Sequence, residues 1–370
     1  MSGQPNGKYS IQKLVHQSPP TDFDSKIDES WIKGKTIVIT GGASGLGKGF
    51  FERWAAAGAC LVIGDISITQ GVKVVSQTAD ETGNRNLHFV HCNVTSWDSQ
   101  VNLFKEAVKK SPHGGIDVVV ASAGISDTKH EFEKPTALDG ANPPPPDLSV
   151  IDVNLKGVMY TTHLAMFWLA RNPGSQPAGT GQDRSRSSGR DRHLLLLSSM
   201  AGLYPIPLQT LYSTSKHALV GLYRSLRSMP SSAGMRINML CPYFIDTPIV
   251  SFGARALLAG GSLGSVDSVI EAGTRLVADP EIVGRAYVVG PKMKAKEAEK
   301  GRWELLDPDS EGGQTSEIVE VYAHDFEETE VLVRRLVKTL NRIVEVRGWF
   351  GYFSDILVAV RSMFWKRKPR

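Results

Sequence analysis

Short apolar runs, rich in valine, isoleucine and leucine, alternate along the chain with longer amphipathic stretches. The runs cover residues 36–40, 60–63, 87–91, 116–121, 194–198, 236–240 and 285–289. Alternation of this kind is typical of βαβ units, in which a crossover helix returns the chain to the start of the next parallel strand. The pattern therefore predicts an α/β fold with one doubly wound parallel sheet of about seven strands and helices on both of its faces.

Three stretches lie outside this alternation. Residues 1–30 are polar and rich in turn-forming residues, which predicts a flexible N-terminal arm ahead of one α/β domain over residues 31–290. Residues 171–192 combine glycine, serine, proline and arginine, so we expect a disordered surface insert between a helix and the fifth strand. Residues 291–370 are expected to form a helical C-terminal extension, because the apolar spacing over residues 324–347 predicts an amphipathic helix.

The end of the extension has an unusual composition. Residues 349–365 are apolar and aromatic, and a basic cluster of Lys366, Arg367, Lys368 and Arg370 follows them. The segment is too short to span a bilayer comfortably. Two interpretations stay open: the tail lies peripherally on a membrane surface, or it packs on its own domain or on a second subunit of a homo-oligomer. Because no apolar run near the N-terminus suits a signal peptide, we expect a cytoplasmic protein.

Composition and charge argue against several classes of function. The formal net charge is only +4, and several positive charges fall in the insert and at the C-terminal end, so no nucleic-acid partner is expected. His88 and His91 would point to opposite faces of one strand, so no metal site is expected there. Cys60, Cys92 and Cys241 lie beside apolar residues at spacings that match neither a zinc site nor a disulfide framework, and we interpret them as reduced core residues.

A glycine-rich turn follows the first apolar run directly. Its sequence, over residues 40–47, is TGGASGLG, and a helix-like stretch comes after it. Glycines let a backbone approach a pyrophosphate closely, and the N-terminus of a helix supplies unpaired N–H groups with a partial positive charge. A strand, turn and helix in this order are typical of a Rossmann-type dinucleotide site, in which Gly41, Ser44, Gly45 and Gly47 are the candidate binding residues.

Asp65 ends the second apolar run. A carboxylate at this position can accept hydrogen bonds from the adenosine ribose hydroxyls, and it would repel a 2′-phosphate. We therefore expect NAD rather than NADP as the cofactor.

The strongest indication of chemistry is the sequence YSTSK, because Tyr212 and Lys216 share one helix face at a spacing of four residues. A free phenol has a pKa near ~10, and a nearby ammonium lowers that pKa by favouring the phenolate. Tyr212 is therefore the candidate proton donor and acceptor. Ser199 follows the fifth apolar run, at the sheet edge where such folds bind ligands, and can hydrogen-bond a substrate oxygen. Asn154 is a fourth polar candidate, with a helix-bending amide as its alternative role.

Taken together, these motifs resemble the short-chain dehydrogenase/reductase family, and the match in order and spacing runs over about residues 33–290. The motifs are TGGASGLG, Asp65, SAG at residues 122–124, VNLKG at 153–157, SSMAG at 198–202, YSTSK at 212–216 and CPYFIDTP at 241–248. The stretches RINMLCPYFIDTPIV and YSTSKHALVGLYRS are especially similar to the branch of NAD-dependent hydroxyprostaglandin dehydrogenase and of alcohol dehydrogenases from fungal natural-product pathways.

The resemblance implies a catalytic set of Ser199, Tyr212 and Lys216, with Asn154 holding a water that links Lys216 to solvent. It also implies contacts to the cofactor. These are Leu46 at the pyrophosphate turn, Ile66 beside Asp65, Asn93 and Val94 beside adenine, Gly124 under the ribose, Tyr212 and Lys216 at the nicotinamide half, and Ile245 and Thr247 against the carboxamide.

Two places depart from the family pattern. Ala121 and Ser122 stand where the family has two asparagines, which puts in doubt a hydrogen bond between the sheet and the ribose side. Tyr243 stands where the family has glycine, and its side chain would narrow the cleft beside the nicotinamide.

On these grounds we predict an oxidoreductase of secondary metabolism that transfers a hydride between NAD and a lipophilic secondary alcohol or ketone. The small apolar residues of the segment 248–264 indicate a hydrophobic substrate pocket. One alternative is an NADPH-dependent ketoreductase. Another, from a different class, is a non-catalytic NAD-binding redox sensor or scaffold, against which the intact set of Ser199, Tyr212 and Lys216 argues.

Overall fold

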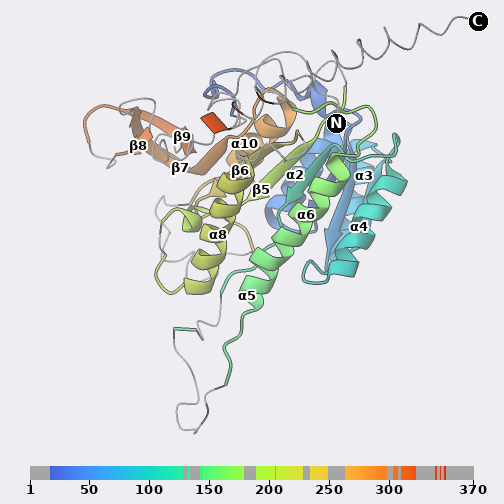
Figure 1. Ribbon diagram of the computed structural model, residues 1–370, viewed down its shortest axis with the longest axis horizontal. Helices are drawn as coiled ribbons and strands as arrows, with labels where there is room; N and C mark the ends of the chain where they lie inside the picture. Colours follow the sequence, from blue (N-terminus) through green and yellow to red (C-terminus); the bar gives the residue numbers. More distant parts are fainter. Residues whose placement is uncertain are drawn as a thin grey trace, which may run out of the picture. The chain divides into compact units, whose positions relative to one another are not determined.

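The computed structural model describes most of the chain between residues 17 and 321. The described residues are 17–127, 132–133, 142, 144–178, 189–204, 206–227, 234–248, 263–297, 303–306, 310–321, 338, 339, 342 and 346. Two compact units make up the chain, one of His16–Ala323 and one of Met1–Val15 with His324–Arg370. All elements described below belong to the first unit. Figure 1 labels many of them.

Seven parallel strands form the centre of the sheet, in the order β3-β2-β1-β4-β5-β6-β7. They are β1 (Thr36–Thr40), β2 (Cys60–Asp65), β3 (Leu87–His91), β4 (Val118–Ala121), β5 (His193–Leu197), β6 (Arg236–Pro242) and β7 (Ala286–Glu297). Each overlaps a predicted apolar run, so the predicted doubly wound α/β fold is confirmed. The strand order reverses between β1 and β4, and sheets of this kind bind ligands beside the carboxyl ends of the strands at such a point.

The helices cover both faces of the sheet. They are η1 (Glu29–Ile32), α2 (Gly45–Ala56), α3 (Ile68–Thr82), α4 (Trp97–Lys110), α5 (Ser149–Ile151), the π-helix η2 (Asp152–Gly157), α6 (Val158–Leu169), η3 (Met200–Gly202), α8 (Thr210–Arg227) and α10 (Val266–Ala278). Alternate strand residues face opposite sides, so Ile37 packs with α2, α3 and α10, whereas Val38 packs with α4, α6 and α8. None of the described helices is both long and apolar enough to cross a membrane.

The sheet continues beyond residue 290, where the sequence indicated a helical extension. The long strand β7 runs on to Glu297, and β8 (Trp303–Leu305) and β9 (Gln314–Val321) both pair with it in antiparallel orientation. The predicted boundary therefore falls inside a strand. The helix predicted over 324–347 lies outside the described residues except at positions 338, 339, 342 and 346, which are helical, and the apolar tail lies outside them entirely.

The N-terminal arm was expected to be flexible up to residue 30, but its second half packs on the domain. The Thr21 hydroxyl hydrogen-bonds the Tyr287 hydroxyl at 2.5 Å, and the Thr21 N–H donates to Glu320 at 2.9 Å. The Phe23 ring meets the Tyr287 ring edge to face at 5.1 Å. Residues 1–16 lie outside the described part.

Both ends of the predicted insert are also anchored in the domain. Asn172 is buried and donates to Asp117 at 2.8 Å. Asp191 is buried and accepts hydrogen bonds from Arg236 at 2.7 to 3.1 Å. The expectation of disorder over the whole insert is therefore wrong at its ends, and residues 179–188 lie outside the described part.

Candidate active site

The four polar residues proposed from the sequence come together at the carboxyl edge of β5. Ser199 lies two residues after the end of β5 and is the N-cap of η3. Tyr212 and Lys216 lie one turn apart on α8, and Asn154 lies in η2. The Lys216 Nζ is 5.5 Å from the centre of the Tyr212 ring. Both η2 and η3 pack against α8.

Lys216 is buried, with 5% of its surface exposed. Its Nζ donates a hydrogen bond to the main-chain oxygen of Leu197 at 3.1 Å. The Ser198 hydroxyl donates to the main-chain oxygen of Lys216 at 3.0 Å, so the side chain and the backbone of this lysine are both fixed to the end of β5. Burial lowers the pKa of the ammonium from 10.5 to about 8.

Ser199 forms hydrogen bonds at the site, and one of them affects the pKa of Tyr212. The Ser199 Oγ accepts the Ala201 N–H at 3.1 Å and lies 3.4 Å from the Pro242 oxygen. Desolvation raises the pKa of the Tyr212 phenol, and its hydrogen bond with Ser199 acts in the opposite direction. The sequence led us to expect a pKa lowered by Lys216, but desolvation is the larger effect for both side chains.

Asn154 is fully buried in the π-helix, and its amide is paired with the backbone of Ile125. Its Oδ1 accepts the Ile125 N–H, and its Nδ2 donates to the Ile125 oxygen, both at 2.8 Å. The Nδ2 also donates to the Ser215 hydroxyl at 3.3 Å. Both amide protons are thus used within the protein, so a water at Asn154 would have to donate to an oxygen.

The glycine turn between β1 and α2 has a backbone that a Cβ would disturb. Gly41 has φ of +70°, and a Cβ there would lie 2.7 Å from the Ala123 Cα, while one on Gly47 would lie 2.2 Å from the Gly41 oxygen. Above Gly45, which begins α2, the nearest side-chain atom is Thr247 Cβ at 3.9 Å from the position of a Cβ. This open cradle at a helix N-terminus fits a dinucleotide pyrophosphate.

Asp65 supports the same loop from the end of β2. Its Oδ2 accepts the Ala43 N–H, and its Oδ1 accepts the Ser67 N–H, both at 3.0 Å. Each carboxylate oxygen retains a further lone pair for a ribose hydroxyl. Ile66, the next residue, is 66% exposed.

Gly124, which the resemblance places under the ribose, lies next to the polar cluster. A Cβ on Gly124 would be 3.4 Å from Asn154 Oδ1 and 3.8 Å from Lys216 Nζ. Nearby, the Ser122 N–H donates to the Thr40 hydroxyl at 3.2 Å, so this contact ties β1 to the loop where the family has asparagine.

The other residues assigned by resemblance have varied surroundings. Leu46 packs against the core, and Ile245 and Thr247 are buried after β6. The Asn93 side chain accepts the Thr95 N–H at 3.0 Å, and Val94 is buried. The set is thus split between residues next to β2 and β3, which the resemblance assigns to adenine, and residues next to β6, which it assigns to the nicotinamide.

Tyr243 packs against Gly290 and Phe244. A Cβ on Gly290 would lie 3.0 Å from the Tyr243 Cβ, and the Tyr243 ring meets Phe244 edge to face at 5.1 Å. Of the segment 248–264, which we expected to line the substrate pocket, residues 249–262 lie outside the described part of the chain.

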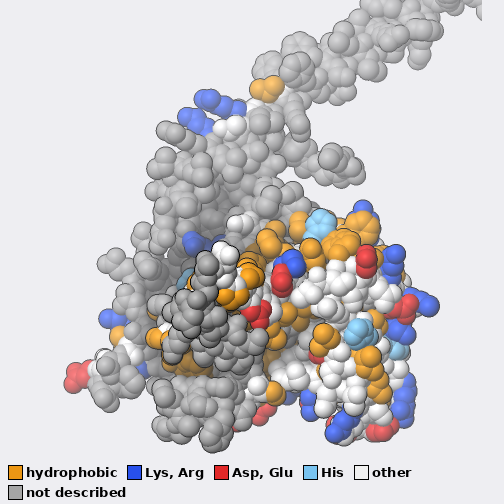
Figure 2. All heavy atoms as spheres, turned by 90° about the horizontal axis from the view of Figure 1, so that it is seen from below, with side chains coloured by type: hydrophobic (Ala, Val, Ile, Leu, Met, Phe, Trp, Pro, Cys, Tyr) orange, Lys and Arg blue, Asp and Glu red, His pale blue; other side chains and the backbone are white. Residues whose placement is uncertain are grey.

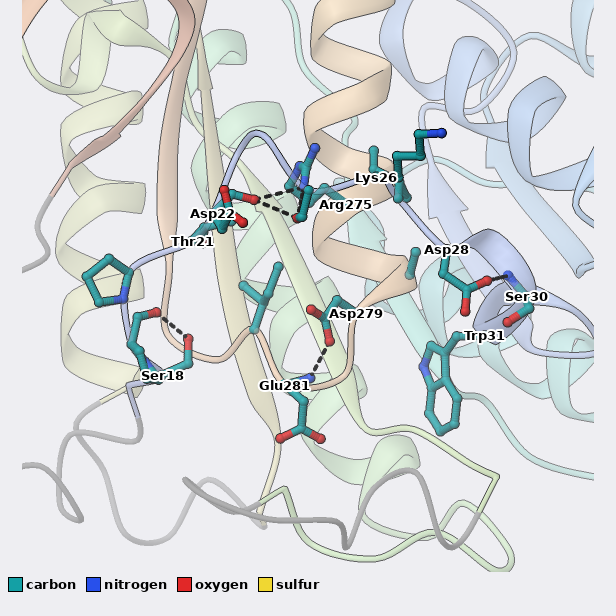
Figure 3. A pocket seen from close by; sticks show the side chains of 16 residues that line it. Ser18, Thr21, Asp22, Lys26, Asp28, Ser30, Trp31, Arg275, Asp279 and Glu281 are labelled. Atoms are coloured by element: carbon teal, nitrogen blue, oxygen red, sulfur yellow. Dashed lines mark hydrogen bonds between the residues drawn. The ribbon is translucent and has the colours of Figure 1, made fainter.

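A pocket of about 430 Å³ lies elsewhere, between the N-terminal segment and the end of α10 (Figure 3). Arg275 donates to the main-chain oxygens of Asp22 and Phe23, both at 3.1 Å, and Asp279 accepts the Glu281 N–H at 3.0 Å. Since Glu281 precedes β7, the pocket belongs to the edge opposite Ser199, and we do not assign it to the active site.

Comparison with known proteins identifies the family of the chain. The model of the short chain dehydrogenase family matches residues 35–255. The chain is 35% identical over 284 residues to a 5′-hydroxyaverantin dehydrogenase of Emericella nidulans, covering 73% of this chain and 88% of the relative. An NADP-dependent dehydrogenase of Cochliobolus lunatus is 33% identical over 71% of this chain and 91% of its own length. The NAD-dependent 15-hydroxyprostaglandin dehydrogenase of Mus musculus is 27% identical over 59% and 70%, respectively.

The fold is also similar to that of solved structures. The crystal structure of a 3-ketoacyl-(acyl-carrier-protein) reductase from Brucella melitensis, complexed with NADH, superposes with a TM-score of 0.56 at 23% identity. The superposition covers 70% of this chain and 97% of that one. With the family model matching more than half of its residues, this chain belongs to the short-chain dehydrogenase family.

Proposed function

We propose that this protein oxidises a lipophilic secondary alcohol to the ketone with NAD, and that it catalyses the reverse reduction when NADH is in excess. The observation that carries the proposal is the meeting of Ser199, Tyr212 and Lys216 at one sheet edge. The names of two relatives support a hydroxyl-bearing substrate, since they describe dehydrogenases of 5′-hydroxyaverantin and 15-hydroxyprostaglandin. We extend this to lipophilic alcohols of secondary metabolism.

Each residue of the cluster has one task in this reaction. The dinucleotide, when bound, supplies the hydride acceptor and a positive charge close to Tyr212. The Tyr212 Oη takes the hydroxyl proton of the alcohol as the carbonyl forms, and returns it in the reverse direction. Ser199 donates a hydrogen bond to the substrate oxygen. Lys216 favours the phenolate electrostatically, and Asn154 Oδ1 can hold a water on the proton path to solvent.

The preference for NAD rests on Asp65. Its carboxylate stands at the end of β2 with a lone pair free on each oxygen, so it suits ribose hydroxyls and repels a 2′-phosphate. Because one relative is named as an NADP-dependent dehydrogenase, an NADPH-dependent ketoreductase is the second candidate function. Assays with both cofactors at equal concentration separate the two candidates.

The decisive experiment replaces Tyr212 by Phe. The variant removes one oxygen from the chemical step and keeps the ring, so NADH formation with a panel of secondary alcohols should fall by about 10²-fold or more, with dinucleotide affinity unchanged. The control is Tyr160→Phe on α6, whose ring contacts Trp97 and which should behave like the wild type. More than about a tenth of wild-type turnover in Tyr212→Phe would contradict the assigned role. A wild-type protein that binds the dinucleotide but oxidises none of the alcohols would favour the sensor.

We also propose that the protein is a homo-oligomer. The helix α6 is rich in apolar residues, and large apolar residues of this helix and of α4 are exposed. These are Trp97, Met159 and Phe167, with exposed fractions of 40 to 49%. Figure 2 shows that on the face it draws, basic and acidic side chains are interspersed with apolar ones. An exposed apolar helix face of this kind suits a protein contact.

A further inference from the structure

A buried amide lies next to the candidate site and has no role so far. Gln100, near the start of α4, is 0% exposed. Its Nε2 donates to the main-chain oxygen of Val94 at 2.6 Å and to that of Gly157 at 2.8 Å. Its Oε1 accepts the Thr161 hydroxyl at 2.8 Å. Both amide protons are therefore used, and each joins a different segment of the chain.

The two carbonyl groups belong to different halves of the candidate site. Val94 lies in the loop after β3, which we assign to the adenine end of the cofactor. Gly157 ends the π-helix that carries Asn154. A π-helical turn interrupts the regular pattern of helical hydrogen bonds, so its carbonyl groups need other donors. The Gly157 oxygen accepts the Gln100 Nε2 at 2.8 Å, and the Thr161 hydroxyl lies 3.0 Å from it. The single proton of that hydroxyl is shared between this oxygen and Gln100 Oε1.

The two segments are also in close contact at this point. A Cβ on Gly157 would lie 3.0 Å from Val94 Cγ2 and 3.2 Å from the Val94 oxygen. The π-helix thus lies directly on the loop, and a shift of one would displace the other, since packed interiors leave little free space.

From the π-helix, hydrogen bonds continue to the helix of Tyr212. The Asn154 Nδ2 donates to the Ser215 hydroxyl at 3.3 Å, and the Ser215 hydroxyl donates to the main-chain oxygen of Tyr212 at 2.7 Å. Asn154 also holds both backbone groups of Ile125, next to Gly124. Any movement of the π-helix therefore reaches both the proton donor and the ribose side.

We propose that Gln100 is a positioning residue that couples the cofactor loop at Val94 to Asn154, and through Asn154 to Tyr212. The inference rests on the proposed function, because it assigns Val94 to the cofactor and Tyr212 to proton transfer. Gln100 itself touches neither cofactor nor substrate. It acts by holding two carbonyl groups at a fixed separation.

The test is Gln100→Met, which keeps the length of the side chain and removes both donors. We expect KM for NAD to rise and kcat to fall together, each by about tenfold, since small misplacements of positioned groups can cost up to ~10²-fold. We also expect the pH profile of kcat to shift, because Asn154 lies on the proton path. The control is Thr274→Val, which removes a different buried hydrogen bond, the one from Trp54 Nε1 at 3.0 Å. That variant should melt at a lower temperature with unchanged kinetics.

A second pair of variants decides the matter if Gln100→Met does not fold. Thr161→Val removes the hydroxyl that contacts both Gln100 and Gly157, whereas Thr161→Ser retains it. The proposal requires the valine variant to show the same joint change in KM, kcat and pH profile to a smaller extent, with the serine variant close to wild type. Variants that lose thermal stability but keep wild-type kinetics and pH profile would overturn it.

Failure of the proposed function has a different signature. In that case the wild-type protein itself oxidises no alcohol, and the coupling is tested by dinucleotide affinity alone, measured by calorimetry. Gln100→Met must then weaken dinucleotide binding relative to Thr274→Val, and equal affinities would overturn the proposal.

Discussion

Lys216 has a cost to folding because its ammonium is buried. The pKa falls from 10.5 in the free side chain to about 8 in the folded protein, so between these values the unfolded chain binds more protons than the folded one. The buried ammonium therefore lowers the free energy of unfolding most below pH 8, and this destabilisation decreases as the pH rises towards 10.5. A strained titratable group of this kind is typical of a functional site.

The corresponding prediction concerns Lys216→Met. At pH 7 the variant should be more stable than the wild type by up to about 3 kcal/mol, because a pKa difference of one corresponds to ~1.4 kcal/mol. The difference should shrink as pH rises from 8 to 10.5. Urea unfolding at several pH values measures it, with the exposed Lys73→Met on α3 as control. A difference that stays constant with pH would show that burial of charge is not its cause.

Asp65 gives a prediction about cofactor choice. Asp65→Ser removes the negative charge that opposes a 2′-phosphate and weakens the hydrogen bonds to the ribose hydroxyls. The ratio of kcat/KM with NADP to that with NAD should rise by about tenfold or more, since hydrogen bonds to a charged group contribute ~1.5–3 kcal/mol. The exposed Asp80→Ser on α3 is the control. If the wild type already prefers NADP, the role given to Asp65 is wrong.

Residues of the site differ in how far the sequence predicts them. Tyr212, Lys216 and Ser199 stand out because their spacing and chemistry are unusual together, and the structure brings them to one place. Gln100 was missed because an amide in a helix is usually solvated. One signal could have found it: Gln100 shares a helix face with Leu103, Phe104 and Ala107, which are all buried.

At the level of elements, the central strands β1, β2 and β5 were predictable because both of their faces are buried and their sequences are almost continuously apolar. The strands β8 and β9 were not predicted. β9 has an exposed first half and carries Glu317 and Glu320, so its pattern is weakly apolar. Only pairing with β7 makes it a strand, and that pairing depends on tertiary contacts.

The ends of the insert show why composition alone does not predict every ordered residue. Composition is averaged over a segment, so a segment rich in glycine, serine and arginine predicts disorder even when one of its aspartates is buried and paired. Asp191 nevertheless lies in the core, where it pairs with the fully buried Arg236 at 2.7 Å. Arg236 also donates to the main-chain oxygens of Leu276 and Val277 at the end of α10. This contact joins β5, β6 and α10.

We expect Asp191→Ala to destabilise the fold by about 3 kcal/mol or more, because removal of one partner leaves a buried guanidinium without its counter-charge, at a cost of ~3–5 kcal/mol. Urea unfolding measures the loss. The double variant Asp191→Leu with Arg236→Met removes both charges and should recover part of the stability. A single variant within about 0.5 kcal/mol of wild type would show that Arg236 is satisfied by its main-chain partners alone.

On the scale of the whole molecule, the strand order explains why residues far apart in sequence form one site. Parallel strands bring all their carboxyl ends to one edge, so the glycine turn after β1, Asp65 on β2 and Ser199 after β5 share that edge. The sequence predicted this much from alternation alone. It did not predict where the domain ends, because β9 and the N-terminal segment pack on β7 from opposite ends of the chain.

The place where the domain ends determines which truncations can test the C-terminal tail. A truncation after residue 290 would remove β9 and leave the buried Arg285 without Glu320, its partner at 3.0 Å, so it would report on folding rather than on the tail. Suitable truncations are after residue 323, where the compact unit ends, and after Arg347.

We predict that the apolar segment 349–365, with the basic cluster after it, binds anionic membranes peripherally. Full-length protein should then sediment with vesicles containing phosphatidylserine, and both truncated proteins should stay in the supernatant while retaining alcohol oxidation. Raising the salt concentration should release the full-length protein, because the basic cluster contributes by charge and added salt screens it. Neutral phosphatidylcholine vesicles are the control.

The competing interpretation is a contact between subunits, and sedimentation velocity distinguishes it. Full-length protein that ignores anionic vesicles, together with a truncation after Arg347 that lowers the oligomeric state, would contradict membrane binding and assign the tail to the homo-oligomer.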